Sequence, residues 1–143
     1  MSISQAMCTL FKKDLLLGDH HLDTDDIRIA LYTSSASLSA ATDGYTTSNE
    51  ITNSSGTAYT AAGATLTSVT PVASSTTAVC DFSDVSYTNA TFTANGALIY
   101  NDSASGDPAC AVIAFGADKT VTSGTFTIQF PTADATNAII RLA

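Results

Sequence analysis

The stretch Leu16–Leu38, LLGDHHLDTDDIRIALYTSSASL, is where the residue pattern changes from helical to extended. Gly18 follows three consecutive leucines, where the end of a helix favours a residue that tolerates a positive φ. From Ile27 to Thr33 the period becomes two, as in a half-buried strand. The predicted inward face of this strand consists of Ile27, Ile29 and Leu31, and the predicted outward face consists of Arg28, Ala30 and Tyr32. The stretch therefore predicts the end of a helix followed by the first core strand.

The segment between this helix and strand carries the run Asp23–Asp26 and two neighbouring histidines. An EF-hand loop needs acidic ligands at alternating positions, a central glycine and a closing glutamate. The run from His21 to Asp26 leads to neither of the last two. His20 and His21 are adjacent, so in an extended chain they point to opposite faces and are poorly placed to chelate one metal ion. We interpret the segment as a solvated turn and predict no metal site in it.

Residues 2–17 are predicted to form an amphipathic helix, because apolar residues recur there at helical spacing. These residues are Met7, Leu10, Phe11 and Leu15. Two residues fit a lone amphipathic helix badly: Asp14 falls inside the apolar arc, and Leu16 points toward the polar side. Two arrangements are compatible with them. Either the helix packs on its own sheet with one face and touches a neighbouring subunit with another, or its last turn is frayed.

The rest of the chain alternates short apolar segments with turn residues, the pattern of an all-β domain. The predicted strands are Tyr45–Ile51 (an edge strand), Ala64–Thr70, Ala78–Phe82, Thr91–Asn101, Ala109–Phe115, Gly124–Phe130 (with Phe126, Ile128 and Phe130 inward) and Asn137–Leu142. The predicted loops and turns are Ser34–Asp43, Asn53–Gly56, Asp102–Pro108 and Gly116–Thr120. Pro71 is expected to end a strand or to confine it to a sheet edge.

The fold predicted from these segments is mainly β: an antiparallel β-sandwich or flattened barrel over residues 27–142, with one N-terminal α-helix over 2–17. At 143 residues the chain, residues 1–143, is expected to be a single domain. Its apolar content of 45% includes many alanines and no tryptophan. We therefore expect a thin core and additional stability from a homo-oligomer, most simply a homotrimer.

Charge and cysteine content narrow the class of protein. The net charge is -8, and the five basic residues are scattered, whereas nucleic-acid binders cluster lysine and arginine. No apolar run is long enough for a membrane helix. The three cysteines, Cys8, Cys80 and Cys110, lack the spacing of a zinc site. Cys80 and Cys110 lie in apolar strand-like segments and are interpreted as buried free thiols, and one disulfide with a spare thiol is the alternative. We expect no nucleic-acid partner, no membrane partner, and assembly in a reducing cytoplasm.

Catalytic signatures are absent from the residue pattern. There is no GxSxG motif, no glycine-rich phosphate loop, and a single glutamate, Glu50. We predict no catalytic residue, no cofactor-binding residue, no metal ligand and no cofactor, and expect the protein not to be an enzyme. Four tyrosines have two interpretations, either lining a carbohydrate or partner surface or filling the rim of the sandwich. They are Tyr45, Tyr59, Tyr87 and Tyr100.

The chain resembles a group of small virion structural proteins of tailed bacteriophages. The resemblance runs in order through nearly the whole chain, and its most specific segments are IRIALYTSS (27–35) and FGADKTVTSGTFTIQFP (115–131). The other segments that carry it are LLGDHHLDTDDIRIALYTSSASL, YTTSNE, GTAYTAAGATL, NGALIYN and the whole of 111–142.

The resemblance implies a particle component in the virion, and within that class a capsid cement (head decoration) protein that binds the major capsid protein. A tail, neck or fibre component, or a receptor- or carbohydrate-binding module, is the alternative that it also implies. On the first reading, the N-terminal helix, the excursion Ser34–Asn53 and the strand edges are candidates for contact with the capsid and with other subunits.

Overall fold

The computed structural model describes residues 2–52 and 56–143, without the side chains of residues 68 and 69. Most of the turn predicted at Asn53–Gly56, and the last residue of the predicted excursion, lie outside the described residues. The elements in chain order are β1 (Ala6–Met7), α1 (Thr9–Leu17), β2 (Ile27–Tyr32), β3 (Ala64–Thr65), β4 (Ser68–Ser74), β5 (Thr77–Phe82), β6 (Val85–Asn101), β7 (Ala109–Ile128) and β8 (Ile140–Leu142).

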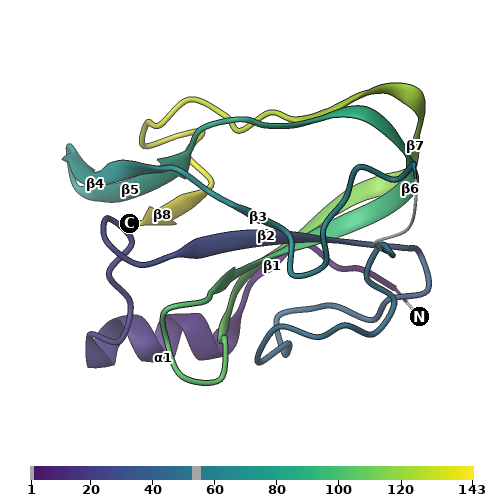
Figure 1. The fold of residues 1–143 in the computed structure, drawn as a ribbon. Coiled ribbons are helices and arrows are strands. Elements are labelled where there is room, and N and C mark those ends of the chain that lie inside the picture. Colours follow the sequence, from purple (N-terminus) through teal and green to yellow (C-terminus); the bar gives the residue numbers. More distant parts are fainter. Residues whose placement is uncertain (1, 53–55) are drawn as a thin grey trace.

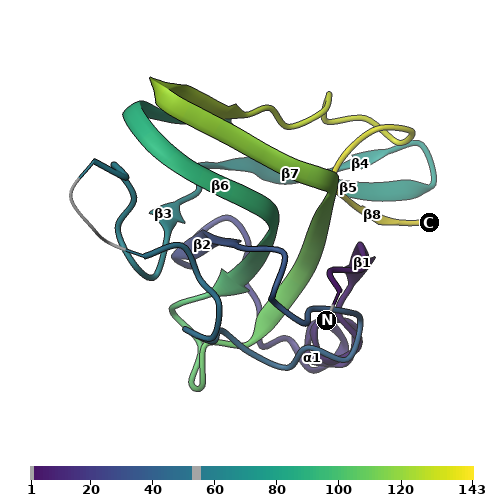
Figure 2. The same ribbon diagram turned by 90° about the vertical axis from the view of Figure 1, so that its right-hand side faces the viewer.

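The strands form two antiparallel sheets, with the orders β1-β7-β6-β2-β3 and β4-β5-β8 (Figures 1 and 2). One buried apolar cluster draws side chains from both sheets, among them Ile29 of β2, Phe82 of β5 and Ile140 of β8. The larger sheet ends at β1 and β3 and does not close on itself. The predicted mainly β fold with one N-terminal helix is confirmed: the strands form two antiparallel sheets and not a closed barrel.

The N-terminal helix is shorter than the predicted range 2–17, because it begins at Thr9. Residues before it are extended: Ile3 bridges Leu38, and β1 pairs with β7. The apolar residues of β1 and α1 fit helical spacing. Residues 2–7 are nevertheless extended, because in this conformation their backbone groups form hydrogen bonds with neighbouring extended segments. The predicted helical range is therefore wrong for its first half.

The end of the helix agrees with the prediction at Gly18, whose φ is 78°. The N–H of Gly18 donates to the carbonyl of Leu15, and the N–H of Asp19 donates to the carbonyl of Asp14. This pair of bonds is the Schellman arrangement, which satisfies the last carbonyls of a helix. The last turn is therefore capped and not frayed.

Strand β2 is more deeply buried than the half-buried strand predicted from its alternation. Its inward residues Ile27, Ile29 and Leu31 are fully buried, as expected, but Ala30 and Tyr32 are also fully buried. The cause is the loop that follows β2. In its described residues, 33–52 and 56–62, it folds back over the far face, and the N–H of Ile51 donates to the carbonyl of Leu31. Of the predicted outward face, only Arg28 reaches solvent.

Strands β6 and β7 form a long curved ribbon joined by the predicted loop after Asn101 (Figure 2). The turn predicted at Gly116–Thr120 is instead a bulge within β7. The register shows the bulge. Ala114 lies opposite Gly96 and Lys119 lies opposite Ala94, so β7 uses more residues than β6 over the same length of the ladder. Extra residues on one strand bend a ribbon without reversing the chain.

Two further strand predictions need correction. Strand β4 continues through Pro71 to Ser74, with a register shift beside the proline, so Pro71 marks an edge strand and does not end it. Residues 45–51 form no named strand, since only Glu50 bridges β2 there. Of the predicted inward residues at the end of β7, Ile128 is buried while Phe126 and Phe130 are half-buried.

Candidate functional site

A buried polar cluster connects the end of α1 to β6, and His20 lies at its centre. The ring of His20 packs on Phe11, with 4.9 Å between ring centroids, and its side chain is fully buried. The side-chain amide of Asn101, also fully buried, donates to His20 Nδ1 at 2.9 Å and to Asp25 Oδ2 at 2.7 Å. The segment predicted as a solvated turn therefore contributes two side chains to an internal network.

The hydrogen bonds of Asn101 determine the protonation state of His20. Asn101 Oδ1 accepts from the N–H of Ser103 at 2.9 Å, so the amide nitrogen must face His20 and Asp25. His20 Nδ1 is then an acceptor, and the proton of the neutral ring sits on Nε2, 3.8 Å from Asp14 Oδ2. Burial lowers the pKa of His20 and outweighs the opposing effect of the nearby carboxylates, Asp14, Asp25 and Asp19.

This cluster predicts a pH dependence of stability. Because the pKa of His20 is lower in the folded than in the unfolded protein, the unfolded state binds more protons just below about pH 6.5, and the free energy of unfolding falls as the pH drops from 7 to 5. Urea unfolding across this range is expected to show a smaller pH slope for His20→Gln than for the wild-type protein. His21→Gln, a change at the exposed neighbour, serves as the matched control. It removes only the smallest influence on the pKa of His20 and should keep most of the wild-type slope. Equal slopes for all three proteins would contradict the assignment.

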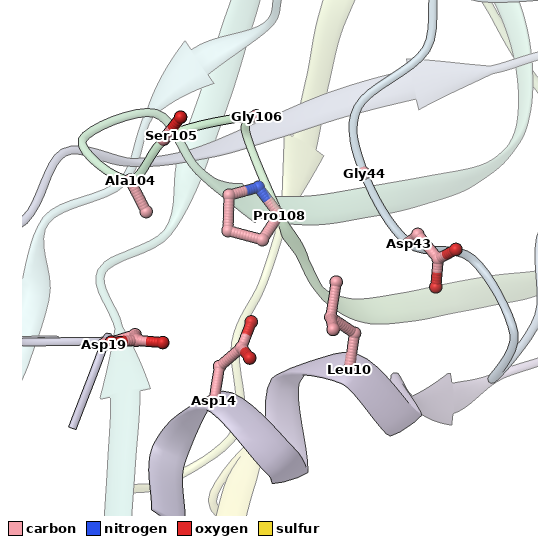
Figure 3. A pocket seen from close by; sticks show the side chains of 9 residues that line it. All are labelled: Leu10, Asp14, Asp19, Asp43, Gly44, Ala104, Ser105, Gly106 and Pro108. Atoms are coloured by element: carbon pink, nitrogen blue, oxygen red, sulfur yellow. The ribbon is translucent and has the colours of Figure 1, made fainter. Parts of the chain in front are cut away.

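A cavity of about 620 Å³ lies beside the same cluster (Figure 3). Three carboxylates line it: Asp14 from α1, Asp19 from the turn after it, and Asp43 from the loop that crosses to the 102–108 hairpin. Leu10 and Pro108 supply its apolar walls. Among the described residues, no group of three or more histidine, cysteine or carboxylate side chains is placed to hold a metal ion. Asp14 is buried, whereas Asp19 and Asp43 are exposed.

Glu50 organises the loop that covers β2, and the sequence reading did not anticipate this role. Its carboxylate is buried and accepts hydrogen bonds from the hydroxyls of Tyr45 and Tyr59, both at 2.6 Å, and from the N–H of Ala62 at 2.9 Å. The Tyr59 hydroxyl in turn accepts from the N–H of Leu31 at 3.0 Å. One carboxylate thereby ties two parts of the loop to β2.

The tyrosines that had two interpretations are interior residues. Tyr59, Tyr87 and Tyr100 are buried, and the half-buried ring of Tyr45 stacks on that of Tyr100 with 4.7 Å between centroids. Burial, followed by the hydrogen bond to Glu50, raises the pKa of Tyr45 and of Tyr59 far above the usual range. These rings fill the space between loop and sheet and do not form an open binding surface.

The most exposed apolar side chains lie at the end of α1, where Leu16 is 90% and Leu17 65% exposed. This end of the helix lies on the same side of the molecule as β4, β5 and β8 (Figure 1). A hollow of about 370 Å³ separates the two and is lined by Leu15, Pro71 and Leu142, among others. We call Leu15–Leu17, Pro71 and Leu142 the helix-end surface. The polar-side position predicted for Leu16 is thus a fully exposed one.

A second apolar hollow, of about 410 Å³, runs beside β7. Its walls include half-buried side chains from β7 and from the chain that follows it: Ile113, Phe115, Phe126, Phe130 and Ile139. Ile139 faces this hollow while the next residue, Ile140, lines the hollow beside the helix end. The two hollows therefore approach each other at the start of β8.

The candidate features of this protein are thus surfaces and structural networks. In the part of the chain that the structure describes, no helix is long and apolar enough to cross a membrane. No protein-family model matches the chain, and neither a curated protein nor a solved structure matches it.

Proposed function

We propose that the protein is a non-enzymatic structural component of a tailed-phage virion, a capsid cement protein that binds the major capsid protein and stabilises the shell. The two most specific segments of the resemblance support this proposal by their position. Residues 27–35 contain β2, and residues 115–131 contain the distal half of β7. The resemblance therefore extends through two strands of the larger sheet.

The observation that carries the proposal is the helix-end surface. Two neighbouring leucines that are 90% and 65% exposed offer apolar contact on a chain of net charge -8. Covering an exposed leucine fully contributes about 1.5–3 kcal/mol. The C-cap at Gly18 fixes the end of the helix, so the leucines are presented by ordered backbone. We propose that this surface contacts the major capsid protein.

A cement protein works through repeated modest contacts. A homotrimer that straddles neighbouring shell subunits makes three copies of the same weak contact. Once the first copy is bound, the other two bind intramolecularly, so the combined affinity is much higher than that of one contact. The acidic charge keeps the protein away from packaged DNA, which repels it. Both arguments favour a shell position over a nucleic-acid contact inside the particle.

Imaging of purified particles tests the proposal. Labelled protein is located by electron microscopy, and its copies per virion are counted by quantitative mass spectrometry. Many copies distributed over the shell are expected. A handful of copies at a vertex, neck or tail tip would exclude cement and support the alternative, a tail, neck or fibre component or a receptor-binding module.

The double variant Leu16→Ser/Leu17→Ser tests the contact itself. Both side chains are exposed, so thermal unfolding and the sedimenting species, expected to be a trimer, should not change. Binding to shells that lack the protein should weaken at least tenfold, since about 1.4 kcal/mol of lost apolar contact already gives that factor. Val72→Ser, at another exposed apolar residue (48%), is the matched control and should bind as the wild type does. Unchanged binding of the double variant would remove the helix-end surface from the proposal.

A further inference from the structure

We propose that Cys8 and Cys110 are a redox-active pair that closes into an intramolecular disulfide when the protein meets a small disulfide oxidant. Both are free thiols in this structure, and both are fully buried. They come from opposite ends of the sequence, but β1 and β7 bring them to adjacent positions of one ladder.

The register places the two cysteines directly opposite each other. In the β1–β7 pair, Ala6 lies opposite Val112 and Met7 opposite Ala111, so the next pair is Cys8 and Cys110. The N–H of Cys8 donates to the carbonyl of Cys110 at 2.9 Å, which confirms that the ladder continues to this pair. Opposite residues of an antiparallel pair have Cα atoms roughly 4.5–5.5 Å apart and side chains on the same face. Disulfides span Cα separations of about 4.4–6.8 Å.

The surroundings of the two sulfurs agree with this placement. Burial is the main cause that raises the pKa of the Cys110 thiol, and electrostatic repulsion from Cys8 is the next. Such repulsion requires the two sulfur atoms to be close. In the reduced state each thiol faces a carbonyl, Cys8 Sγ that of Ser39 and Cys110 Sγ that of Pro108, both at 3.9 Å. Side-chain rotation turns the sulfurs from these carbonyls toward each other.

The chemistry is thiol–disulfide exchange. The thiolate of one cysteine attacks a sulfur of the oxidant and releases one thiol, and the second cysteine then attacks the mixed disulfide and releases the other. Two electrons pass from the cysteine pair to the oxidant, and the two protons leave with its thiols. Burial raises the pKa of Cys8 to about 11, so the closed structure reacts slowly. Opening of the N-terminal segment, whose strand β1 has two residues, controls the rate.

The disulfide would join the β1–α1 segment covalently to β7, across about a hundred residues of intervening chain. A cross-link of that span restricts the unfolded chain strongly. Its biological consequence rests on the proposed function: a virion protein folds in a reducing cytoplasm and becomes cross-linked after release into an oxidising medium. The cross-link itself is tested on purified protein, so its failure and that of the particle assignment are separate results.

The experiment uses the Cys80→Ser variant, which keeps the pair and removes the third thiol. Protein is incubated with oxidised glutathione, quenched with maleimide under denaturing conditions and analysed by intact mass and peptide mapping. We expect reactive thiols to fall from two to none, a Cys8–Cys110 linked peptide, and a melting temperature higher by roughly 5–15 °C that dithiothreitol reverses. Wild-type protein should retain one thiol, on Cys80.

Two results would overturn the inference. One is persistence of both thiols in Cys80→Ser after prolonged oxidation at a temperature just below melting, where the N-terminal segment opens. The other is a linkage that joins two chains or involves Cys80 in the wild-type protein. Cys8→Ser is the matched negative control. In this variant Cys110 should form no disulfide within the chain, and the oxidant should not raise the melting temperature.

Discussion

Ile29→Asp is expected to leave the protein unfolded at 25 °C. Ile29 is fully buried in β2, which lies between β6 and β3 in the larger sheet. The substitution removes a buried apolar side chain, a loss of about 2–5 kcal/mol, and places a carboxylate where no cation is available, which costs about 3–5 kcal/mol more. Domains of this size are stable by only about 5–15 kcal/mol, so the sum removes most or all of that margin.

Circular dichroism and proteolysis of the purified variant provide the measurement. The matched control is Thr125→Asp, which adds the same carboxylate at an exposed position of β7 and should unfold within a few degrees of the wild-type protein. Ile128→Asp should be less severe than Ile29→Asp, because Ile128 is the last residue of β7 and borders the hollow beside it. A cooperative, wild-type melting transition for Ile29→Asp would mean that the inward face of β2 is wrongly assigned.

The elements that the sequence predicts well are those that a local residue pattern marks. Gly18 and the strand from Ile27 onward were predictable, because a helix cap and a period of two are local signals. The burial of Tyr32 was not, since it depends on how the loop that follows β2 folds back, where the Thr46 carbonyl accepts a hydrogen bond from the Tyr32 hydroxyl. Burial of a second face is a tertiary effect that alternation cannot encode.

The errors at the N-terminus and in β7 have the same origin. The apolar spacing around Met7 fits a helix, but hydrogen bonds from β7 outweigh helix propensity for residues before Thr9. At Gly116 the glycine was a correct sign of irregular backbone, with a φ of 80°. A bulge and a chain reversal use the same residue types, so the sequence alone did not distinguish them.

The candidate sites were predictable to a smaller extent. The exposure of Leu16 follows from its place on the polar side of the helix. The pairing of Cys8 with Cys110 does not, because it needs the register of β1 on β7. Glu50 likewise carried no local signal: a single glutamate in a Ser/Thr-rich loop is ordinarily a solvated residue. Only the folded loop shows that its carboxylate has three donors.

Glu50→Ala is expected to release the loop that covers β2. The substitution removes an acceptor from the hydroxyls of Tyr45 and Tyr59 and from the N–H of Ala62, and leaves these donors at a partly or fully buried site. Each unsatisfied buried donor costs about 1–3 kcal/mol, so the free energy of unfolding should fall by roughly 3–5 kcal/mol. Urea unfolding measures this loss, and limited proteolysis should show new cleavage within residues 44–62.

Tyr45→Phe and Tyr59→Phe separate the contributions of the individual bonds. Tyr59→Phe should be the more destabilising, because the Tyr59 hydroxyl also accepts the Leu31 N–H inside the sheet. The ring of Tyr45 is half-buried, and in Tyr45→Phe it retains its stacking on Tyr100. In a double-mutant cycle, Glu50→Ala combined with Tyr59→Phe should cost less than the sum of the single changes, since both remove the same bond. Additive losses, or unchanged protease sensitivity of the loop in Glu50→Ala, would show that packing of the tyrosine rings holds the loop and that the carboxylate does not.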